Sequence, residues 1–117
     1  MNVIRLKDAP TYHPPGHVDM RCLRVQGKEA GPSDGLVMNL CHLLPGGSTG
    51  MDASPVEKMY LVLEGRVTIS NGETEVELDR WDSVRIAAHE PRLVENRTNV
   101  PATVLLAMPD PARPAPS

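Results

Sequence analysis

Proline and glycine interrupt this chain at short intervals, and no other feature of the sequence limits its possible folds so strongly. Twelve of the 117 residues are proline and nine are glycine. Because proline breaks helices and glycine marks turns, this spacing argues against an all-helical bundle. Short apolar runs lie between the turn signals, which is typical of an antiparallel β-sandwich or barrel. We therefore expect an all-β fold, with strands over residues 18–26, 36–44, 58–63, 66–70, 73–78, 84–87, 92–96 and 102–108.

The pair Asn71-Gly72 gives the clearest local signal. Both residue types tolerate positive φ, which a two-residue type I′ hairpin turn requires at both positions. Such a turn would place Ser70 opposite Glu73 and would fix the register of the two strands. In that register the inner face carries Val67, Ile69 and Val76, whereas Arg66, Thr68, Glu75 and Glu77 face water.

The chain has the length of one domain. We expect an N-terminal arm over residues 1–17, a barrel over residues 18–108 and a proline-rich C-terminal tail over residues 109–117. Cys22 and Cys41 form no C-x-x-C pattern and are expected to be reduced and buried. Charged residues among the first eight positions interrupt any signal peptide, so we expect a cytoplasmic protein.

Charge and composition disfavour two classes of partner. The chain has 12 Lys and Arg against 15 Asp and Glu, a formal net charge of −3, whereas surfaces that bind nucleic acid are basic. One Trp and two Tyr are too few aromatic residues for a platform that stacks single-stranded bases. No apolar run approaches the roughly 20 residues of a membrane-spanning helix. We expect neither nucleic acid nor a membrane as a partner.

Two segments carry spaced polar and turn residues. The first resembles the first motif of the cupin superfamily, G-x5-H-x-H-x3-E-x6-G, and matches its spacing at Gly46, Asp52, Ser54, Lys58 and Gly65. The second resembles the second cupin motif, G-x5-P-x-G-x2-H-x3-N. In it Trp81 and His89 stand at the two Gly positions, Ala87 at Pro, Arg92 at His and Asn96 at Asn.

The resemblance covers roughly residues 36–108 and implies a cupin double-stranded β-helix, or jelly-roll, barrel. Members of this superfamily are often homodimers, and the barrel often holds a divalent metal on three His and one Glu side chain. Here Asp52, Ser54, Lys58 and Arg92 occupy the four ligand positions. A charged Lys is a poor ligand and Arg is always charged. We therefore expect that the usual metal site is lost and that no cofactor is bound.

The replaced positions could form a substitute site. Strand alternation puts Asp52, Ser54, Lys58 and Tyr60 on one face of their strands, and the second motif implies that Arg92 and Val94 face the same lumen. We hypothesise that Asp52 and Ser54 hold the Lys58 ammonium and that Arg92 binds a carboxylate or phosphate. A desolvated Lys58 would act as a general base or Schiff-base nucleophile. The candidate catalytic residues are Lys58, Arg92, Asp52, Tyr60 and His89, and the candidate substrate-binding residues are Arg92, Lys58, Ser54, His42 and Trp81.

Structural roles are the alternatives for several of these residues. An ion pair between Asp52 and Lys58 could simply fill a lost metal site. Tyr60 could be a wall residue whose hydroxyl group finds a partner. We expect Asn96 to hydrogen-bond the backbone of the turn that follows it.

The histidines leave a metal open as an alternative. A divalent cation could bind at a displaced site if His42, His89 and Asp52 converge. His13 and His17 lie in the proline-rich arm and are expected to face solvent or a partner.

Three functions remain open. The first is an enzyme without the usual cupin metal: a lyase, decarboxylase, isomerase or cyclase that acts on a small anionic organic acid. The second is a non-catalytic module that binds or senses a small anion, and the third is a metal-dependent oxygenase or isomerase with relocated ligands. No helix-turn-helix is visible, which favours a stand-alone enzyme by analogy of fold. The apolar residues Met59, Leu61 and Leu63 on the outer face need cover, so we expect a homodimer.

Overall fold

The computed structural model describes residues 1–110 and 112, so the expected tail lies largely outside the described residues. The described residues form nine strands and two short 3-10 helices. No helix in this part of the chain is long and apolar enough to cross a membrane. The elements are η1 (Leu6–Asp8), β1 (Thr11–Tyr12), β2 (Val18–Gln26), η2 (Lys28–Ala30), β3 (Leu36–Ser48), β4 (Lys58–Glu64), β5 (Val67–Ser70), β6 (Glu75–Leu78), β7 (Ser83–Ile86), β8 (Leu93–Glu95) and β9 (Ala102–Pro109).

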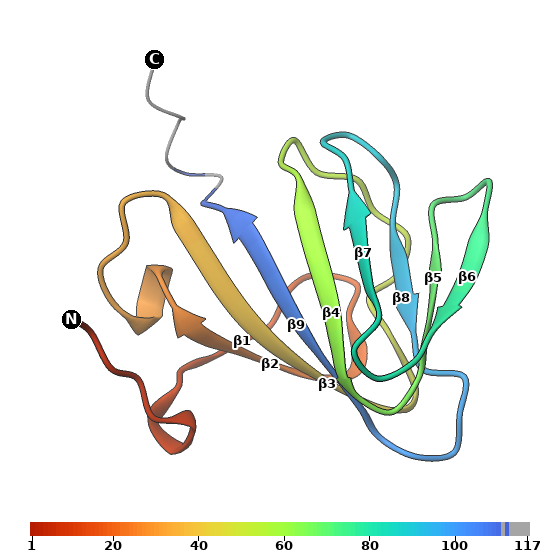
Figure 1. Ribbon diagram of the computed structural model, residues 1–117, viewed down its shortest axis with the longest axis horizontal. Coiled ribbons are helices and arrows are strands. Elements are labelled where there is room, and N and C mark those ends of the chain that lie inside the picture. Colours follow the sequence, from red (N-terminus) through yellow and green to blue (C-terminus); the bar gives the residue numbers. More distant parts are fainter. Residues whose placement is uncertain (111, 113–117) are drawn as a thin grey trace.

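The strands join into one antiparallel sheet that curls into a nearly closed barrel (Figure 1). Its order is β6-β5-β8-β3-β9-β4-β7, with β2 added to β3 and β1 added to β2. The long strand β3 lies at the centre, because it pairs with β2 and β9 and, at Ser48, with β8. The expected all-β barrel is confirmed.

Most strands begin and end within two residues of the positions expected from the sequence. The exception is β3, which continues to Ser48 instead of ending at Leu44. The backbone of this extension pairs with Asn96: Gly46 N donates to Asn96 O (2.8 Å) and Asn96 N donates to Gly47 O (2.9 Å). The pairing partner lies far along the chain, so the local turn signal could not reveal it.

Alternation along the strands separates a core face from an outer face. On β3, Asn39, Cys41 and Leu43 point inward and are buried, whereas His42 and Leu44 lie on the opposite face. Both cysteines are free and buried, as expected. The core consists of Cys22, Cys41, Leu43, Tyr60, Val62, Val67, Ile69, Ile86, Val94, Ala102, Val104 and Leu106.

The β5–β6 hairpin forms, but its turn lies one residue later than predicted. Asn71 N donates to Thr74 O (3.2 Å), so the turn centres on Gly72 and Glu73. The side-chain oxygen of Asn71 accepts hydrogen bonds from the N–H groups of Glu73 (3.0 Å) and Thr74 (2.8 Å). This local capping competes with the left-handed conformation that a type I′ turn would need at Asn71.

Two side chains of this hairpin therefore lie in unexpected surroundings. Thr68, predicted to face water, is only 4% exposed and is flanked by Glu77 and Glu95 on the neighbouring strands. Val76, predicted to be inside, is 41% exposed because β6 is at the edge of the sheet. The predicted register was wrong by two residues, although Val67 and Ile69 are buried as expected.

The backbone is left-handed at the two positions where glycines of the second motif are replaced. Trp81 (φ 73°) and His89 (φ 67°), which stand at Gly positions of the second motif, are both left-handed. At Gly65, the last residue of the first motif, φ is 76° and a Cβ atom would lie 2.7 Å from the carbonyl oxygen of Pro101. The sequence alignment to the motifs therefore agrees with the local geometry.

Candidate functional site

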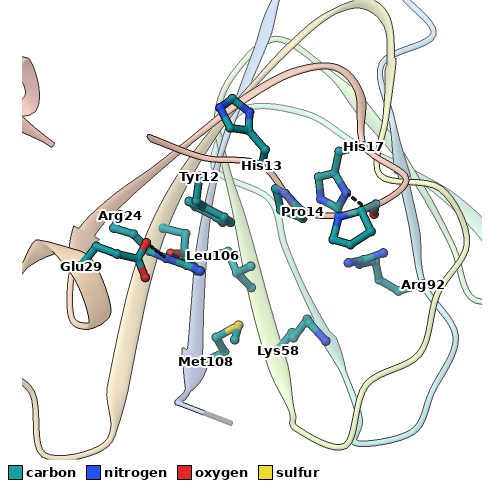
Figure 2. A pocket seen from close by; sticks show the side chains of 12 residues that line it. Tyr12, His13, Pro14, His17, Arg24, Glu29, Lys58, Arg92, Leu106 and Met108 are labelled. Carbon is teal, nitrogen blue, oxygen red and sulfur yellow. Dashed lines mark hydrogen bonds and ion pairs between the residues drawn. The ribbon is translucent and has the colours of Figure 1, made fainter. Parts of the chain in front are cut away.

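A cavity of about 460 Å³ lies between the N-terminal segment and the strands β2, β3, β4 and β9 (Figure 2). Its volume is within the range of small-molecule binding sites. Its lining combines cationic, aromatic and apolar side chains from elements that are far apart in the sequence. The lining residues are Tyr12, His13, Pro14, Pro15, His17, Arg24, Glu29, Asn39, Lys58, Arg92, Leu106 and Met108.

Lys58 reaches this cavity from the first position of β4. Its side chain is buried, at 8% exposure, and its Nζ contacts the Ser54 hydroxyl group. Burial lowers the pKa of Lys58 below the ordinary value of 10.5, and the positive charge of Arg92 lowers it further, whereas the carboxylate of Asp52 opposes the shift. The ammonium is therefore easier to deprotonate than that of a surface lysine.

Arg92 lies beside Lys58 on the same side of the cavity (Figure 2). Its Nε donates to the Tyr60 hydroxyl group (3.0 Å) and its Nη1 donates to the carbonyl of Gly50 (3.3 Å). Burial is the main cause that raises the pKa of Tyr60, so this hydroxyl is a neutral acceptor. The three side chains Lys58, Tyr60 and Arg92 meet as strand alternation and the motif spacing predicted.

The N-terminal segment forms one wall of the cavity. Tyr12 of β1 pairs with Cys22 of β2, and the chain then crosses the opening through Pro14 to His17. Burial lowers the pKa of His17, and the charge of Arg92 adds to this effect. The sequence placed His13 and His17 at the solvent or a partner. His13 is exposed, as expected, and His17 is half-buried. Their place at the cavity depends on the pairing of β1 with β2, which no local signal predicts.

Arg24 organises the opposite side of the cavity, which the sequence did not predict. Its Nε donates to Glu29 Oε2 (3.2 Å), its Nη1 donates to Asn39 Oδ1 (2.8 Å), and its guanidinium carbon lies 3.5 Å from the centre of the Tyr12 ring. One side chain thus connects β1, β2, β3 and η2. Figure 2 shows Arg24 and Glu29 across the cavity from Lys58 and Arg92.

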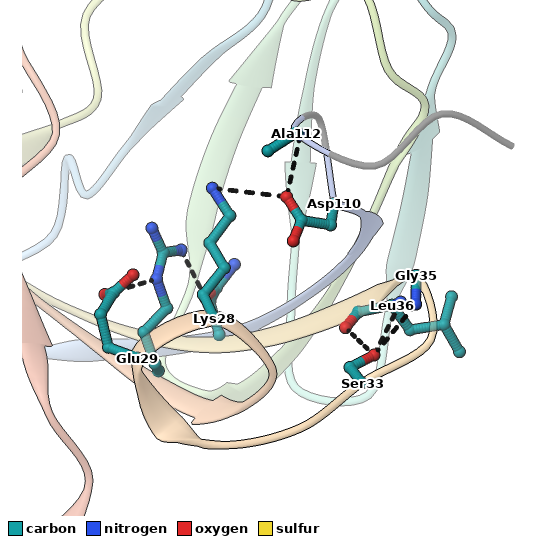
Figure 3. Close-up of polar contacts among 9 residues, drawn as sticks. Lys28, Glu29, Ser33, Gly35, Leu36, Asp110 and Ala112 are labelled. Carbon is teal, nitrogen blue, oxygen red and sulfur yellow. Dashed lines mark hydrogen bonds and ion pairs between the residues drawn. The ribbon is translucent and has the colours of Figure 1, made fainter.

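The η2 turn that carries Glu29 is anchored to the end of the barrel (Figure 3). Lys28 Nζ lies 3.9 Å from Asp110 Oδ1, and Asp110 N donates to the carbonyl of Gly35 (2.8 Å). Ser33 Oγ accepts a hydrogen bond from Gly35 N (3.3 Å) within the same connection. These contacts hold the η2 turn, and Glu29 with it, in a defined position against the barrel.

The barrel interior beyond Arg92 is nearly filled. A space of about 30 Å³ remains there among core side chains that include Cys41, Leu43 and Val104. Such a volume is too small for an organic molecule. A ligand would therefore bind in the 460 Å³ cavity at the mouth of the barrel.

Asp52 does not form the ion pair with Lys58 that the sequence predicted. Its carboxylate is exposed and accepts a hydrogen bond from Ala53 N (2.9 Å), and no carboxylate lies within 4.0 Å of Lys58 Nζ in the described part of the chain. Asp52 is joined to Arg92 instead through two backbone hydrogen bonds of 2.8 and 3.1 Å. Its side chain acts on Lys58 only at longer range.

Three further predicted residues lie away from the cavity. His42 is on the outer face of β3, where its Nδ1 is 3.0 Å from Thr103 Oγ1. Trp81 is 62% exposed in the β6–β7 connection, beneath the Arg80 guanidinium, and His89 is exposed in the β7–β8 connection. His42 and Trp81, predicted to bind substrate, and His89, predicted to be catalytic, therefore do not line this cavity.

The donor set does not fit a divalent metal at the usual cupin position. A protonated Lys58 and Arg92 offer no lone pair and repel a cation. The displaced site also fails to assemble, because the described residues contain no group of three His, Cys, Asp or Glu side chains that could hold a metal ion. In particular, His42, His89 and Asp52 do not converge.

Comparisons with known proteins agree with the motifs and the fold. The Cupin domain model matches residues 39–108. A protein named beta-D-galactosidase Rv1717 from Mycobacterium tuberculosis is 32% identical over 111 residues, which cover 95% of this chain and 96% of that protein.

Solved structures give the same result for the fold. The polyketide cyclase RemF from Streptomyces resistomycificus superposes with a TM-score of 0.81 at 19% identity, covering 93% of this chain and 79% of that one. The protein TT1209 from Thermus thermophilus superposes with a TM-score of 0.70 at 26% identity, covering 97% of this chain and 100% of that one. With its two motifs, its barrel and the matching family model, this chain belongs to the cupin domain family.

Proposed function

We propose that this protein is a cupin that binds a small organic anion at Lys58 and Arg92 and catalyses a proton transfer on it without the usual cupin metal. One observation carries the proposal: two cationic side chains face the same cavity, and neither has a carboxylate partner within 4.0 Å in the described part of the chain. With Arg24 balanced by Glu29, the lining keeps two uncompensated positive charges.

Charge in this position favours an anionic ligand. A buried cation without a counter-ion is costly, and a carboxylate would relieve that cost for Lys58 and Arg92 together. Arg92 uses Nε and Nη1 for Tyr60 and Gly50, which holds the guanidinium in place for a ligand. The carboxylate would accept from the guanidinium on one side and from the Lys58 ammonium on the other.

The lowered pKa of Lys58 supports a catalytic role beyond binding. The reaction proceeds in the fraction of the complex in which Lys58 is neutral and Arg92 alone holds the carboxylate. Lys58 Nζ then accepts a proton from the carbon next to a carbonyl group of the ligand, and the electron pair of the C–H bond moves to the carbonyl oxygen. Where that carbon carries a hydroxyl group, the ammonium returns the proton to the former carbonyl carbon while the hydroxyl proton passes to the former carbonyl oxygen. The carbonyl group thus moves by one carbon, which is an isomerase reaction with balanced protons and electrons. Arg92 keeps the ligand carboxylate fixed during both transfers.

Glycoside hydrolysis is the second candidate, because the Mycobacterium tuberculosis relative is named a galactosidase. Glycosidases generally use two carboxyl groups on either side of the bond that is cleaved. The cavity lining supplies one carboxylate, Glu29, and it is engaged by Arg24. We therefore favour the isomerase, and hydrolysis of a chromogenic galactoside that is lost in Glu29→Gln would favour hydrolysis instead.

We also propose that the protein forms a homodimer through the outer face of β4, β7 and β9. This face carries an apolar groove of about 360 Å³ that includes Met59, Leu61 and Leu105. Met59 is 51% exposed. A second copy would cover these side chains.

The test of the proposed function measures binding and turnover separately. Hexanoate is titrated into the wild type, Lys58→Met and Arg92→Met by NMR, with the exposed Lys7→Met and Arg80→Met as charge-matched controls. We expect each cavity variant to lose at least tenfold in affinity, which is about 1.4 kcal/mol, and the controls to bind like the wild type.

Lys58→Arg separates catalysis from binding. It keeps the positive charge but does not deprotonate near neutral pH, so it should retain hexanoate binding. It should lose the exchange of the C3 protons of 2-oxohexanoate with deuterated solvent that the wild type is expected to catalyse. Unchanged hexanoate affinity in both Lys58→Met and Arg92→Met would refute the proposed site. If Lys58→Arg exchanged these protons at the wild-type rate, the catalytic role of Lys58 would be refuted and only the binding of an anion would remain.

A further inference from the structure

The side of the cavity opposite Lys58 contains a buried donor that lacks a partner. Asn39 is fully buried on β3, and its Oδ1 accepts from Arg24 Nη1 (2.8 Å). Because a guanidinium only donates, this contact fixes the orientation of the amide and leaves Nδ2 to face elsewhere. Among the described residues, Asn39 Nδ2 has no hydrogen-bond partner. Buried donors are almost always satisfied in folded proteins, and Asn39 lines the cavity, so Nδ2 is the donor on this side that is available to an acceptor on a bound ligand.

Glu29 adds an acceptor beside this donor. Its Oε2 binds Arg24 Nε (3.2 Å), and the same guanidinium binds Asn39, so one side chain aligns both groups at the cavity. A hydroxyl group both donates and accepts, and it can bind Asn39 Nδ2 and the Glu29 carboxylate together. A second carboxylate on the ligand would be repelled by Glu29, and an apolar group would leave Asn39 unsatisfied.

The two sides of the cavity therefore recognise different groups on one molecule. Lys58 and Arg92 lie on one side, and Arg24 with Glu29 lies on the other, with Leu106 and Met108 between them (Figure 2). We infer that the organic anion is a hydroxylated acid of the sugar-acid class, with its carboxylate at Lys58 and Arg92 and a hydroxyl group at Asn39 and Glu29. This inference rests on the proposed function, and it adds the substrate class.

Arg24 acts here as a positioning residue. It stacks on Tyr12 and donates to both Asn39 and Glu29, so its own charge is balanced and its donors are largely used within the protein. The carboxylate of the ligand is therefore directed to the side with uncompensated charge, at Lys58 and Arg92. This asymmetry fixes the direction in which the ligand binds.

A set of six-carbon probes tests the inference. D-gluconate and D-glucuronate carry both a carboxylate and hydroxyl groups, hexanoate carries only the carboxylate, and D-glucitol carries only hydroxyl groups. NMR titrations at one fixed ionic strength compare their affinities for the full chain. We expect at least one of the two hydroxylated acids to bind tenfold or more tightly than hexanoate, and glucitol to bind more weakly than either acid.

Asn39→Asp removes the donor that the inference uses and also adds a negative charge that acts on every acid alike, so the losses for the two probes are compared with each other. It keeps an oxygen for Arg24 and replaces the Nδ2 donor with an acceptor. We expect a loss of at least tenfold in affinity for the hydroxylated acid and less than threefold for hexanoate. Glu29→Gln, on the exposed η2 turn, should also weaken the hydroxylated acid selectively, with the exposed Glu73→Gln as its control and circular dichroism to confirm folding.

The outcomes separate this inference from the proposed function. Hydroxylated acids that bind no more tightly than hexanoate, or an equal loss for all acids in Asn39→Asp, would overturn the sugar-acid assignment. In that case, hexanoate binding that still depends on Lys58 and Arg92 would continue to support the proposed anion site. Failure of the proposed function appears instead as hexanoate binding that is insensitive to both Lys58→Met and Arg92→Met.

Discussion

The proposed function depends more on Lys58 than on any other residue of the cavity. It stands where the first cupin motif has a metal ligand, is 8% exposed and has the Ser54 hydroxyl group as its contact. Burial and the charge of Arg92 lower its pKa, and no carboxylate within the described residues forms an ion pair with it. A protonated Lys58 at this position would repel a cation and would favour the anion that the proposed function requires.

This environment predicts how anion binding depends on pH. The protonated ammonium is the form that attracts a carboxylate, so the affinity is full below the pKa of Lys58 and falls as the pH rises through it. Because burial and Arg92 lower that pKa, the fall begins below the ordinary value of 10.5. Hexanoate titrations between pH 6 and pH 10, as a rough working range, should show this fall in the wild type. Lys58→Met should show a weak and flat affinity, and an equal slope in both proteins would contradict the assignment.

Trp81 predicts a gain in stability on substitution. It holds φ at 73°, a conformation that costs a non-glycine residue about 1 kcal/mol, and its ring is 62% exposed. Trp81→Gly should therefore raise the free energy of unfolding by about that amount and the melting temperature by roughly 4 °C. Trp81→Ala removes the same ring but keeps the strain, so thermal denaturation should show no comparable gain for it. A stabilised alanine variant would assign the effect to the ring.

The residues that could be predicted from the sequence are those whose position follows from strand alternation. Lys58 and Tyr60 share a face because they are two positions apart on β4, and the motif spacing brings Arg92 to them. Arg24 and Asn39 could not be found in this way, because their roles arise from contacts between separate strands.

At the scale of elements, local sequence signals predicted the positions of most strands correctly but predicted the connections between them less well. The apolar run at residues 18–26 coincides with β2, since Gly27 ends it with a φ of 82°. In the β5–β6 connection, the hydrogen bonds of the Asn71 side chain stabilise a turn centred on Gly72 and Glu73 instead of the predicted turn at Asn71 and Gly72. The two-residue strand β1 has no periodicity to detect and depends on its pairing with β2.

The connection from β8 to β9 depends on one buried amide. Asn96 is fully buried, its Nδ2 donates to Leu43 O (3.1 Å) and Val100 O (2.8 Å), and its Oδ1 accepts from Thr98 N (3.0 Å). The predicted contact of Asn96 with the following turn is confirmed. The hydrogen bond to Leu43 also joins this connection to β3.

Replacing this amide should destabilise the barrel. Asn96→Ala removes the side-chain donor to the buried Leu43 carbonyl and the acceptor of the Thr98 N–H group, which should lower the free energy of unfolding by about 2–4 kcal/mol. Urea denaturation measures the loss. The exposed Asn99→Ala in the same connection is the control and should change stability by less than about 0.5 kcal/mol. Equal effects of the two variants would show that the side-chain hydrogen bonds of Asn96 contribute little.

At the scale of the molecule, the filled interior leaves the mouth of the barrel as the place where a ligand would bind. Core side chains leave about 30 Å³ beyond Arg92, whereas about 460 Å³ is open between Lys58 and the N-terminal segment. The groove on the outer face of β4, β7 and β9 is separate from this cavity, since the two share no lining residue within the described part of the chain. Association through that face would leave the mouth accessible to a ligand.

The outer groove predicts the oligomeric state. Met59 pairs with Ala107 and Leu61 with Leu105 across β4 and β9, so their side chains form one continuous apolar surface. We expect the wild type to sediment at twice the monomer mass of 12.7 kDa. Met59→Glu places a charge in the centre of this surface and should shift the protein to monomers, because an unpaired charge buried between subunits is strongly unfavourable. Val76→Glu, at an exposed position on β6, should leave the dimer intact. A monomeric wild type, or dissociation by Val76→Glu rather than by Met59→Glu, would place any association on another face. Retention of hexanoate binding by monomeric Met59→Glu would further show that each barrel mouth works without its partner.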